Sequence, residues 1–149
     1  MEVIEKFISK FTSKKLDNVV KEGDRFYFAE KDLVELRSKI TKQPYSVGLF
    51  LGEIKKNNFK PSVALIDWLS HNSERKVFLN KNSAWLFICG RDVFGKGIVK
   101  ANVKEGFVLV QNEADENLGY GEIVANLSLK DKMVIKNFLD KGDFLRREH

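Results

Sequence analysis

WLFICGRDVFGKGIVKANV, residues 85–103, is the stretch that decides the fold of this chain. Two further short apolar runs, FVLVQ (107–111) and LGYGEIV (118–124), follow it. Glycines separate these runs, and glycine permits tight turns and close approach of two backbones. The pattern is typical of a small β-rich module, so we expect the second half of the chain to form one.

Composition allows one large domain or two small domains within the 149 residues. Hydrophobic residues make up 43% of the chain and twelve residues are Phe, which is enough apolar surface for a packed core. The formal net charge is +5, and a basic balance favours polyanionic partners such as RNA. Lysine-rich proteins of many kinds share such a charge, so the charge alone does not establish nucleic-acid binding.

Cysteine usage and the N-terminal residues predict an intracellular, reducing setting. Cys89 is the only cysteine, which excludes a disulfide within the chain and a cysteine-based metal cluster. Its neighbours Phe87 and Ile88 favour a buried thiol. Residues 1–10 lack the apolar core of a signal peptide, and no run approaches the roughly 18 apolar residues that span a bilayer. We expect a cytoplasmic protein without a membrane segment.

The first half of the chain mixes helices with strands. Residues Ile4, Phe7 and Phe11 are spaced to lie on one face of a helix. The expected elements are helices over Ile4–Phe11, Lys31–Ile40 and Val63–Leu69 with Ser62 as N-cap, strands over Leu16–Lys21, Arg25–Phe28 and Tyr45–Leu51, and a loop or edge strand over Ile54–Lys60. Short hairpin links between the strands favour an antiparallel sheet flanked by helices.

A polar run at residues 71–73 marks the expected domain boundary. The prediction is an α+β fold, with an N-terminal α/β domain over residues 1–73 and a small β-barrel-like domain over residues 74–149. The second domain is expected to begin with a strand over Lys76–Leu79, followed by a short helix through Trp85.

Residues suited to catalysis are scarce in this sequence. The two histidines, His71 and His149, are not paired with an orienting carboxylate by any recognisable motif. The glycine-rich run 90–97 lacks the spacing of a phosphate-binding loop. We therefore expect no enzymatic activity, no cofactor and no metal site. A small RNA-modifying enzyme would need a pocket with convergent polar groups near Cys89 or His71.

The order of the pieces in the second half resembles the PUA domain, an RNA-binding module. The matching pieces are GRDVF (90–94), GIV (97–99), the strands 107–111 and 118–124, and DKGDFLR (140–146). Of these, the resemblance carries over Gly90 and Gly121 as backbone positions. It also favours a strand beginning near Met133, where periodicity alone leaves helix and strand open.

The first half is similar to the first domain of the "nuclear import protein seven" family. The matching pieces are DRFYFAEK (24–31), VGLFLG (47–52) and ALIDWL (64–69), and KVFLN (76–80) continues the same order into the second half. Members of this family are ribosome-biogenesis factors of archaea and eukaryotes in which an α/β domain precedes a PUA domain. The compact, lysine-rich chain resembles the archaeal members.

This resemblance implies a non-enzymatic, RNA-binding factor for the processing and assembly of large-subunit precursor rRNA. The partners that it implies are other ribosome assembly factors, the exosome and the Shwachman-Bodian-Diamond protein. The alternative is a protein-interaction adaptor of the RNA-processing machinery whose RNA contact is incidental, and an exposed apolar patch on the first domain would support it. We expect a monomer that binds single-stranded, uridine-rich RNA.

RNA is expected along the short helix and the last strand of the PUA half. The candidate residues are Lys81, Arg91, Lys96 and Lys100 near the helix, and Lys130, Lys132, Lys136, Arg146 and Arg147 on or near the strand. Any single lysine has the alternative role of keeping a barrel surface soluble. Two adjacent arginines favour RNA binding, because they place one guanidinium on each strand face.

Aromatic and acidic residues complete the expected surface. Core positions are expected for Phe87, Phe94, Phe107, Phe138 and Phe144, while the position of Trp85 is left open between core and surface. The acidic turn Asn112–Asn117 would repel RNA, and it is expected to point away from the site.

Overall fold

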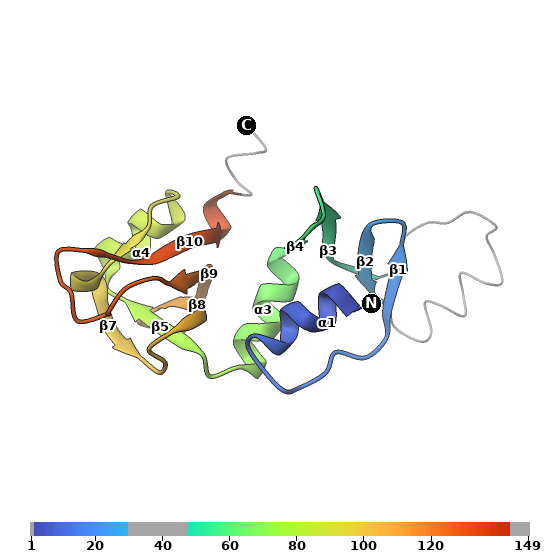
Figure 1. Ribbon diagram of the computed structural model, residues 1–149, viewed down its shortest axis with the longest axis horizontal. Coiled ribbons are helices and arrows are strands. Elements are labelled where there is room, and N and C mark those ends of the chain that lie inside the picture. The colour runs from blue at the N-terminus through green and yellow to red at the C-terminus, as the bar shows by residue number, and fades with distance from the viewer. Residues whose placement is uncertain (1, 30–47, 144–149) are drawn as a thin grey trace. The chain divides into compact units, whose positions relative to one another are not determined.

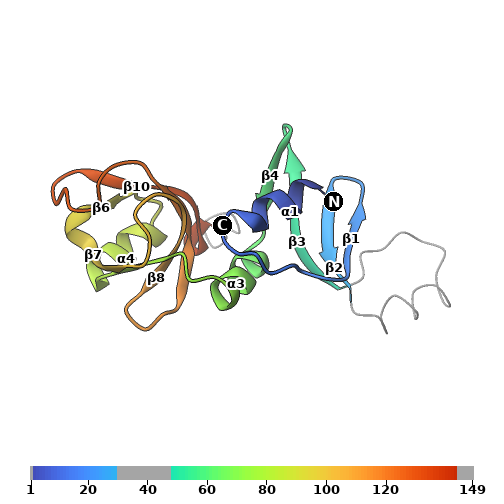
Figure 2. The same ribbon diagram turned by 60° about the horizontal axis from the view of Figure 1, so that its bottom comes forward.

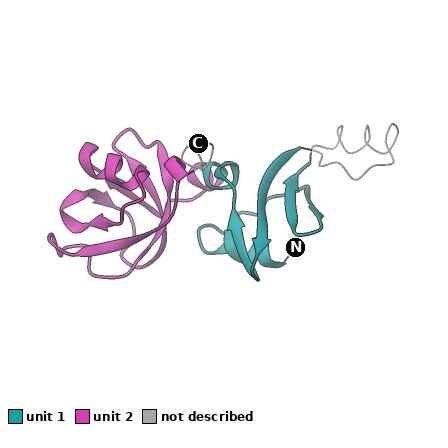
Figure 3. Cartoon of the chain, turned by 90° about the horizontal axis from the view of Figure 1, so that it is seen from above, with its two compact units in different colours: residues 1–68 teal, residues 69–149 magenta. Residues whose placement is uncertain are grey.

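The chain forms two compact units, residues 1–68 and residues 69–149 (Figure 3). The structure is a computed structural model that describes residues 2–29 and 48–143. Each unit has a β-sheet of its own. No helix within the described residues is long and apolar enough to cross a membrane.

Unit 1 is built around a four-stranded antiparallel sheet. Its elements are α1 (Glu2–Ser9), β1 (Val19–Glu22), β2 (Arg25–Phe28), β3 (Leu49–Lys55), β4 (Asn58–Pro61) and the first part of α3 (Val63–Asn72). The strand order is β1-β2-β3-β4, and all neighbours are antiparallel, as predicted. The predicted helix Lys31–Ile40 lies outside the described residues.

Several boundaries in this unit differ from the sequence prediction. Helix α1 spans Glu2–Ser9 rather than Ile4–Phe11, and β1 begins at Val19 rather than Leu16. Strand β3 continues to Lys55, because the turn that ends it lies at Lys56 and Asn57, which adopt φ angles of 49° and 66°. The segment predicted as a loop or edge strand is therefore divided between the end of β3 and the edge strand β4. Helix α3 starts as predicted, with Ser62 accepting a hydrogen bond from Leu65 N–H at 3.1 Å, but it extends beyond Leu69 to include the polar residues of the expected break.

Aromatic rings form the core of unit 1. Phe7 of α1 lies 5.3 Å from Phe59 of β4, and Phe59 lies 5.7 Å from Phe26 of β2, measured between ring centroids. Ile4 and Ile8 are buried beside them on the same helix face. The apolar face of α1 that the sequence predicts therefore packs on the sheet.

Unit 2 is built around a six-stranded sheet that is nearly closed into a barrel (Figures 1 and 2). Its elements are β5 (Lys76–Leu79), α4 (Lys81–Ile88), β6 (Val93–Phe94), the 3-10 helix η1 (Gly95–Gly97), β7 (Ile98–Ala101), β8 (Gly106–Asn112), β9 (Asn117–Ile123) and β10 (Met133–Asp140). The order is β6-β10-β9-β8-β5-β7, and only β5 and β8 are parallel. The two outermost strands, β6 and β7, are consecutive in sequence and joined by η1, so the sheet must curl. Strand β10 begins at Met133, as predicted.

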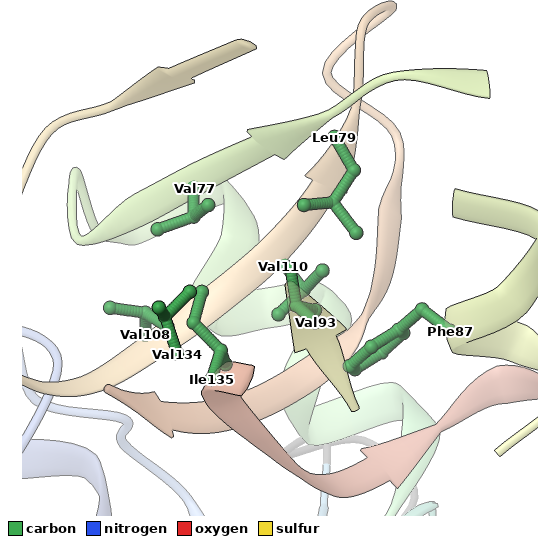
Figure 4. Close-up of a cluster of buried hydrophobic side chains, with 8 residues drawn as sticks. All are labelled: Val77, Leu79, Phe87, Val93, Val108, Val110, Val134 and Ile135. Atoms are coloured by element: carbon green, nitrogen blue, oxygen red, sulfur yellow. The ribbon is translucent and has the colours of Figure 1, made fainter. Parts of the chain in front are cut away.

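The core of unit 2 fills the inside of this curled sheet (Figure 4). Seven of its buried side chains come from strands, and the eighth, Phe87, comes from α4. The eight residues are Val77, Leu79, Phe87, Val93, Val108, Val110, Val134 and Ile135. Helix α4 thus covers the barrel through Phe87, with Ala84 packed beside it, and the exposed residues of the helix are Lys81, Asn82, Trp85 and Leu86.

Two glycines let β9 and β10 approach each other closely. A Cβ added at Gly119 would overlap the carbonyl oxygen of Leu139, and one added at Gly121 would overlap that of Lys136. Gly119 also has a φ of 147°, a conformation that side chains disfavour. The Gly-Tyr-Gly sequence is therefore a requirement of the contact between β9 and β10.

We predict that Gly119→Ala destabilises unit 2 by at least about 2 kcal/mol more than Gly106→Ala, because the added methyl group meets main chain at Gly119. Gly106 is the matched control: its φ is also positive, at 84°, but a Cβ there meets only the far end of the Arg75 side chain. Hydrogen exchange of the β9 and β10 amides reports the stability of this unit by itself. Equal losses in the two variants would contradict the account.

Candidate nucleic-acid interface

Four of the predicted RNA-binding lysines are brought together by main-chain hydrogen bonds. Asn80 N–H donates to Gly97 O (2.9 Å), which places Lys81 beside η1. Lys96 N–H donates to Lys130 O (3.0 Å), and Gly95 N–H donates to Lys132 O (3.2 Å). We call Lys81, Lys96, Lys130 and Lys132 the lysine cluster. All four are exposed, as is Asp131, whose carboxylate offsets part of the positive charge.

The beginning of α4 fixes the geometry of the lysine cluster. Asn80 is the N-cap residue, and its side-chain oxygen accepts a hydrogen bond from Ser83 N–H at 2.9 Å. A Cβ at Gly97 would overlap the Ser83 side chain, so η1 packs directly on the first turn of the helix. A cap at one end of β5 and a glycine in η1 therefore hold Lys81 and Lys96 together.

A second pair of cationic residues, Arg91 and Lys136, lies at the other end of α4. Asn137 joins them: its side-chain amide donates to Phe87 O (3.0 Å) and to Arg91 O (3.2 Å). Its main-chain N–H donates to the Asp92 carboxylate at 2.8 Å. These bonds tie β10 to the end of α4. They bring the segments that carry Arg91 and Lys136 together, and both of these side chains are exposed.

Trp85 lies on α4 between these two groups. Its side chain is 62% exposed. Lys81, Trp85 and Cys89 are spaced by four residues, so they lie along one helix face. Among the described residues, no ring or cation contacts the indole. The interface thus has cations at both ends of α4 and an exposed aromatic face between them.

The prediction of a buried Cys89 is wrong, because the thiol is exposed. Helix α4 continues to Ile88, three residues beyond the predicted end at Trp85. Continued helical geometry turns Phe87 into the core and leaves Cys89, the C-cap residue, outside it.

Two of the predicted core aromatics are also exposed, Phe94 at 44% and Phe138 at 40%. Phe94 follows the buried Val93 in a two-residue strand, so it faces outward, opposite Met133. Phe138 lies where the register between β10 and β9 shifts. Phe87 is fully buried, as predicted, and Phe144 lies outside the described residues.

Phe138 belongs to an aromatic group on the outer face of the sheet. Its ring centroid lies 5.7 Å from that of Phe107 and 5.9 Å from that of Tyr120. The Lys136 ammonium lies 5.7 Å from the centre of the Phe138 ring, at the distance of a cation–π contact. The exposed Phe138 ring therefore continues the interface along β10.

Three predicted residues are not placed at this interface. Lys100 lies on β7 and contacts the Phe78 ring at 5.6 Å, at the opposite edge of the sheet from β10. Arg146 and Arg147 lie outside the described residues, so their role stays a prediction. Sequence reasoning missed Asn137, and no local signal marks it, because its partners precede it by 45 to 50 residues.

The acidic turn is held by contacts within unit 2. The Lys76 ammonium lies 3.1 Å from the Asp115 carboxylate, and the Gln111 amide donates to the same carboxylate at 2.9 Å. The hydrogen bond from Gln111, assisted by Lys76, lowers the pKa of Asp115 below its usual value. Gln111 also donates to Ser70 Oγ at 3.0 Å, which joins the turn to the end of α3. Part of the turn's negative charge is thus neutralised by Lys76.

The described part of the chain holds no group of three or more His, Cys, Asp and Glu side chains that would bind a metal. One cavity, of about 330 Å³, lies in unit 1 between α1 and the segment that follows it. A second, of about 630 Å³, lies in unit 2 between the end of β7 and residues 123–128. Neither Cys89 nor His71 lines either of these cavities.

Comparison with known families follows the same division of the chain. Residues 75–149 match the UPF0113 PUA domain, and residues 1–63 match the NIP7/UPF0113 pre-PUA domain. The chain belongs to the NIP7/UPF0113 family. This confirms the family that the sequence resembles, and with it the expectation of a PUA domain in the second half.

Individual relatives come from archaea and from eukaryotes. A UPF0113 protein of Archaeoglobus fulgidus is 29% identical over 140 residues, covering 87% of this chain and 78% of its own length. The "60S ribosome subunit biogenesis protein NIP7 homolog" of Tetraodon nigroviridis is 27% identical over 138 residues, covering 85% and 76%. A conserved PUA domain protein from Thermoplasma acidophilum has the same fold, with a TM-score of 0.64 at 16% identity over 99% of this chain and 92% of that one.

We predict that Tyr120→Phe reduces the loss of folding stability at alkaline pH. Burial raises the pKa of Tyr120 from 10 to about 12. Between these values the unfolded phenol releases its proton while the folded one keeps it, so stability falls as pH rises through this window. The wild type should lose up to about 2.5 kcal/mol more than the variant between pH 10 and pH 12. Chemical unfolding followed by circular dichroism measures the free energy of unfolding of both proteins at each pH. If the two free energies fall in parallel as pH rises, Tyr120 does not have this role.

Proposed function

We propose that this protein is a non-catalytic RNA-binding factor that acts on large-subunit precursor rRNA during ribosome assembly. The observation that carries the proposal is α4, which has an exposed tryptophan and cationic residues at both ends. The PUA domain to which residues 75–149 belong is an RNA-binding module, and the name of the Tetraodon relative supports the ribosomal role.

The geometry suits a single strand of RNA along α4 and β10. A helix of eight residues is about 12 Å long, so the lysine cluster and the pair Arg91 and Lys136 are spaced to contact different phosphates of one strand. An unpaired base offers a flat face to the Trp85 indole, whereas the bases of a duplex are already stacked on one another. The substrate we propose is therefore unpaired RNA, with uridine-rich sequence as the first probe.

The cellular setting is part of the same proposal. We place the RNA-binding domain at residues 74–149 and the protein in the cytoplasm. The partners are other assembly factors, with the exosome and the Shwachman-Bodian-Diamond protein as the first to examine. Binding of these proteins to the purified chain, with and without RNA, tests this part separately.

The adaptor alternative finds little support in unit 1. It requires an exposed apolar patch there, and Leu49 is the one large hydrophobic residue that the described part of unit 1 exposes, at 55%. A single exposed leucine does not form a docking surface. RNA binding through unit 2 is therefore the function that the geometry favours.

We predict that Lys96→Ala/Lys130→Ala and Arg91→Ala/Lys136→Ala each weaken binding to a labelled ten-nucleotide oligouridine. Each lost phosphate contact should lower the slope of log K against log salt by about 0.7, because fewer counterions are released. Fluorescence anisotropy across a salt series measures both the affinity and the slope.

The matched control for this experiment is Lys14→Ala/Lys15→Ala, which removes two exposed charges from unit 1. It should bind like the wild type. Arg146→Ala/Arg147→Ala tests in the same assay whether the two arginines add to the interface. If both unit 2 variants of the first pair bind like wild type while this control binds weakly, the RNA site lies elsewhere.

We further predict that oligouridine quenches the fluorescence of Trp85. The chain has two tryptophans, so Trp68→Phe leaves Trp85 as the only indole signal. Trp85→Ala should weaken binding by about 1–3 kcal/mol, or roughly 5- to 150-fold, because a stacked base loses its platform. Leu86→Ala removes the neighbouring exposed side chain and should have little effect. Stronger quenching by duplex RNA than by oligouridine would count against an unpaired substrate.

A further inference from the structure

The barrel of unit 2 is closed at η1, and next to η1 its two outermost strands are not paired with each other. Its outermost strands, β6 and β7, are joined by η1, and η1 is hydrogen-bonded to Lys130 and Lys132. Beyond that closure, β7 pairs with β5 and with no other strand of the described residues. One edge of β7 is therefore left unpaired (Figure 1).

The register of β7 shows which main-chain groups lie on this edge. Asn102 N–H donates to Lys76 O, and Lys100 is the partner of Phe78. In an antiparallel pair, alternate residues turn both N–H and C=O toward the partner strand. The N–H and C=O groups of Ala101 therefore point away from β5, whereas Val99 lies at the β-bulge where the register shifts. Ala101 is exposed, so these groups can bond to another extended chain.

An apolar groove lies next to this free edge. It has a volume of about 630 Å³, and its lining runs from Ala101 and Val103 on one side to residues 123–128 on the other. Ile123, Ala125 and Leu127 give the second side its apolar character. Val99 and Val124 are exposed by 55% and 49% at the edge of β7 and in the groove wall.

Charge at the groove favours an acidic occupant. Lys104 lines the groove, and Lys100 lies on β7 beside it. Neither lysine is in an ion pair with any described residue. Glu105 also lines the groove and carries the opposite charge, which leaves a net positive rim.

We propose that this edge binds an extended, acidic segment of a partner protein. The segment adds to the sheet as a strand antiparallel or parallel to β7 and bonds to the main chain of Ala101. Alternate side chains of the segment are apolar and enter the groove, and the residues between them are acidic and face Lys100 and Lys104. RNA fits this surface less well, because six of the ten residues that line the groove are Val, Ala, Ile or Leu, and Lys104 is the one cation among the ten.

This surface is separate from the RNA interface that we propose. The RNA interface uses α4 and β10, whereas the groove uses the far end of β7 and residues 123–128. The inference does not rest on RNA binding, so either can fail without the other.

The test is a titration of isotope-labelled, full-length protein with an eight-residue peptide of alternating valine and aspartate, followed by NMR. We expect saturable shifts confined to residues 98–104 and 123–128, and at least tenfold slower hydrogen exchange at the Ala101 amide. A peptide of alternating valine and lysine is the matched control and should bind at least tenfold more weakly.

Two variants separate docking from folding. Ala101→Pro removes a main-chain donor that points away from β5, so the sheet keeps its bonds while the peptide loses one. Lys104→Glu reverses one charge at the rim. Each should weaken peptide binding at least fivefold, while the amide spectrum outside the groove stays unchanged; if the proline variant unfolds, the charge variant decides.

Three results would overturn the proposal. The first is the absence of saturable shifts with the acidic peptide. The second is equal binding of the acidic and basic peptides, which would indicate nonspecific apolar contact. The third is a set of shifts in residues 98–104 and 123–128 that oligouridine produces and the acidic peptide does not, which would assign the groove to nucleic acid.

Discussion

The candidate RNA interface depends on the hydrogen bonds of one side chain, Asn137. The last carbonyl groups of a helix are not used by its own hydrogen bonds. Phe87 O, at the end of α4, accepts from Gly90 N–H at 2.9 Å, and the amide of Asn137 adds a second donor from β10. The same amide bonds to Arg91 O, and the adjoining main chain bonds to Asp92. Helix and strand are thus held together by directional contacts, which keep the cations of both at fixed separations. Packing of Phe87 and the hydrogen bond from Asn80 N–H to Gly97 O hold the rest of α4 on the barrel.

Unit 2 carries two kinds of surface, a group of lysines where η1 closes the barrel and an unpaired strand edge on β7. At η1, main-chain bonds to residues 130 and 132 bring lysines together, and that concentration of charge suits a phosphate backbone. Past η1 the sheet edges are not bonded to each other, and the exposed groups are peptide bonds and aliphatic side chains. A short linker between two edge strands therefore determines where charge gathers and where the sheet stays incomplete.

Much of the fold could be predicted from the sequence because its signals are local. Helical spacing identified the buried face of α1, and the short apolar runs between glycines indicated a β-rich second half, whereas β10 was predicted only from the family resemblance. The predictions for Phe94, Phe138 and Cys89 are wrong for one reason. The position of an apolar residue in its strand or helix decides whether it faces the core or solvent, and a β-bulge or a longer helix changes which side it faces. The grouping of Lys96 with Lys130 could not be predicted, since it needs a bond across 34 residues. The resemblance to a family supplied what local patterns lacked, namely which elements to examine as a candidate RNA site.

The strand order of unit 2 has a consequence for synthesis of the chain. Strand β10 pairs with β6 and β9 and anchors α4, yet it is the last of these elements to be made. A nascent chain that ends before Met133 has α4 without its anchor and β6 without a partner. The candidate RNA interface is therefore complete only once β10 has left the ribosome, late in the translation of the chain.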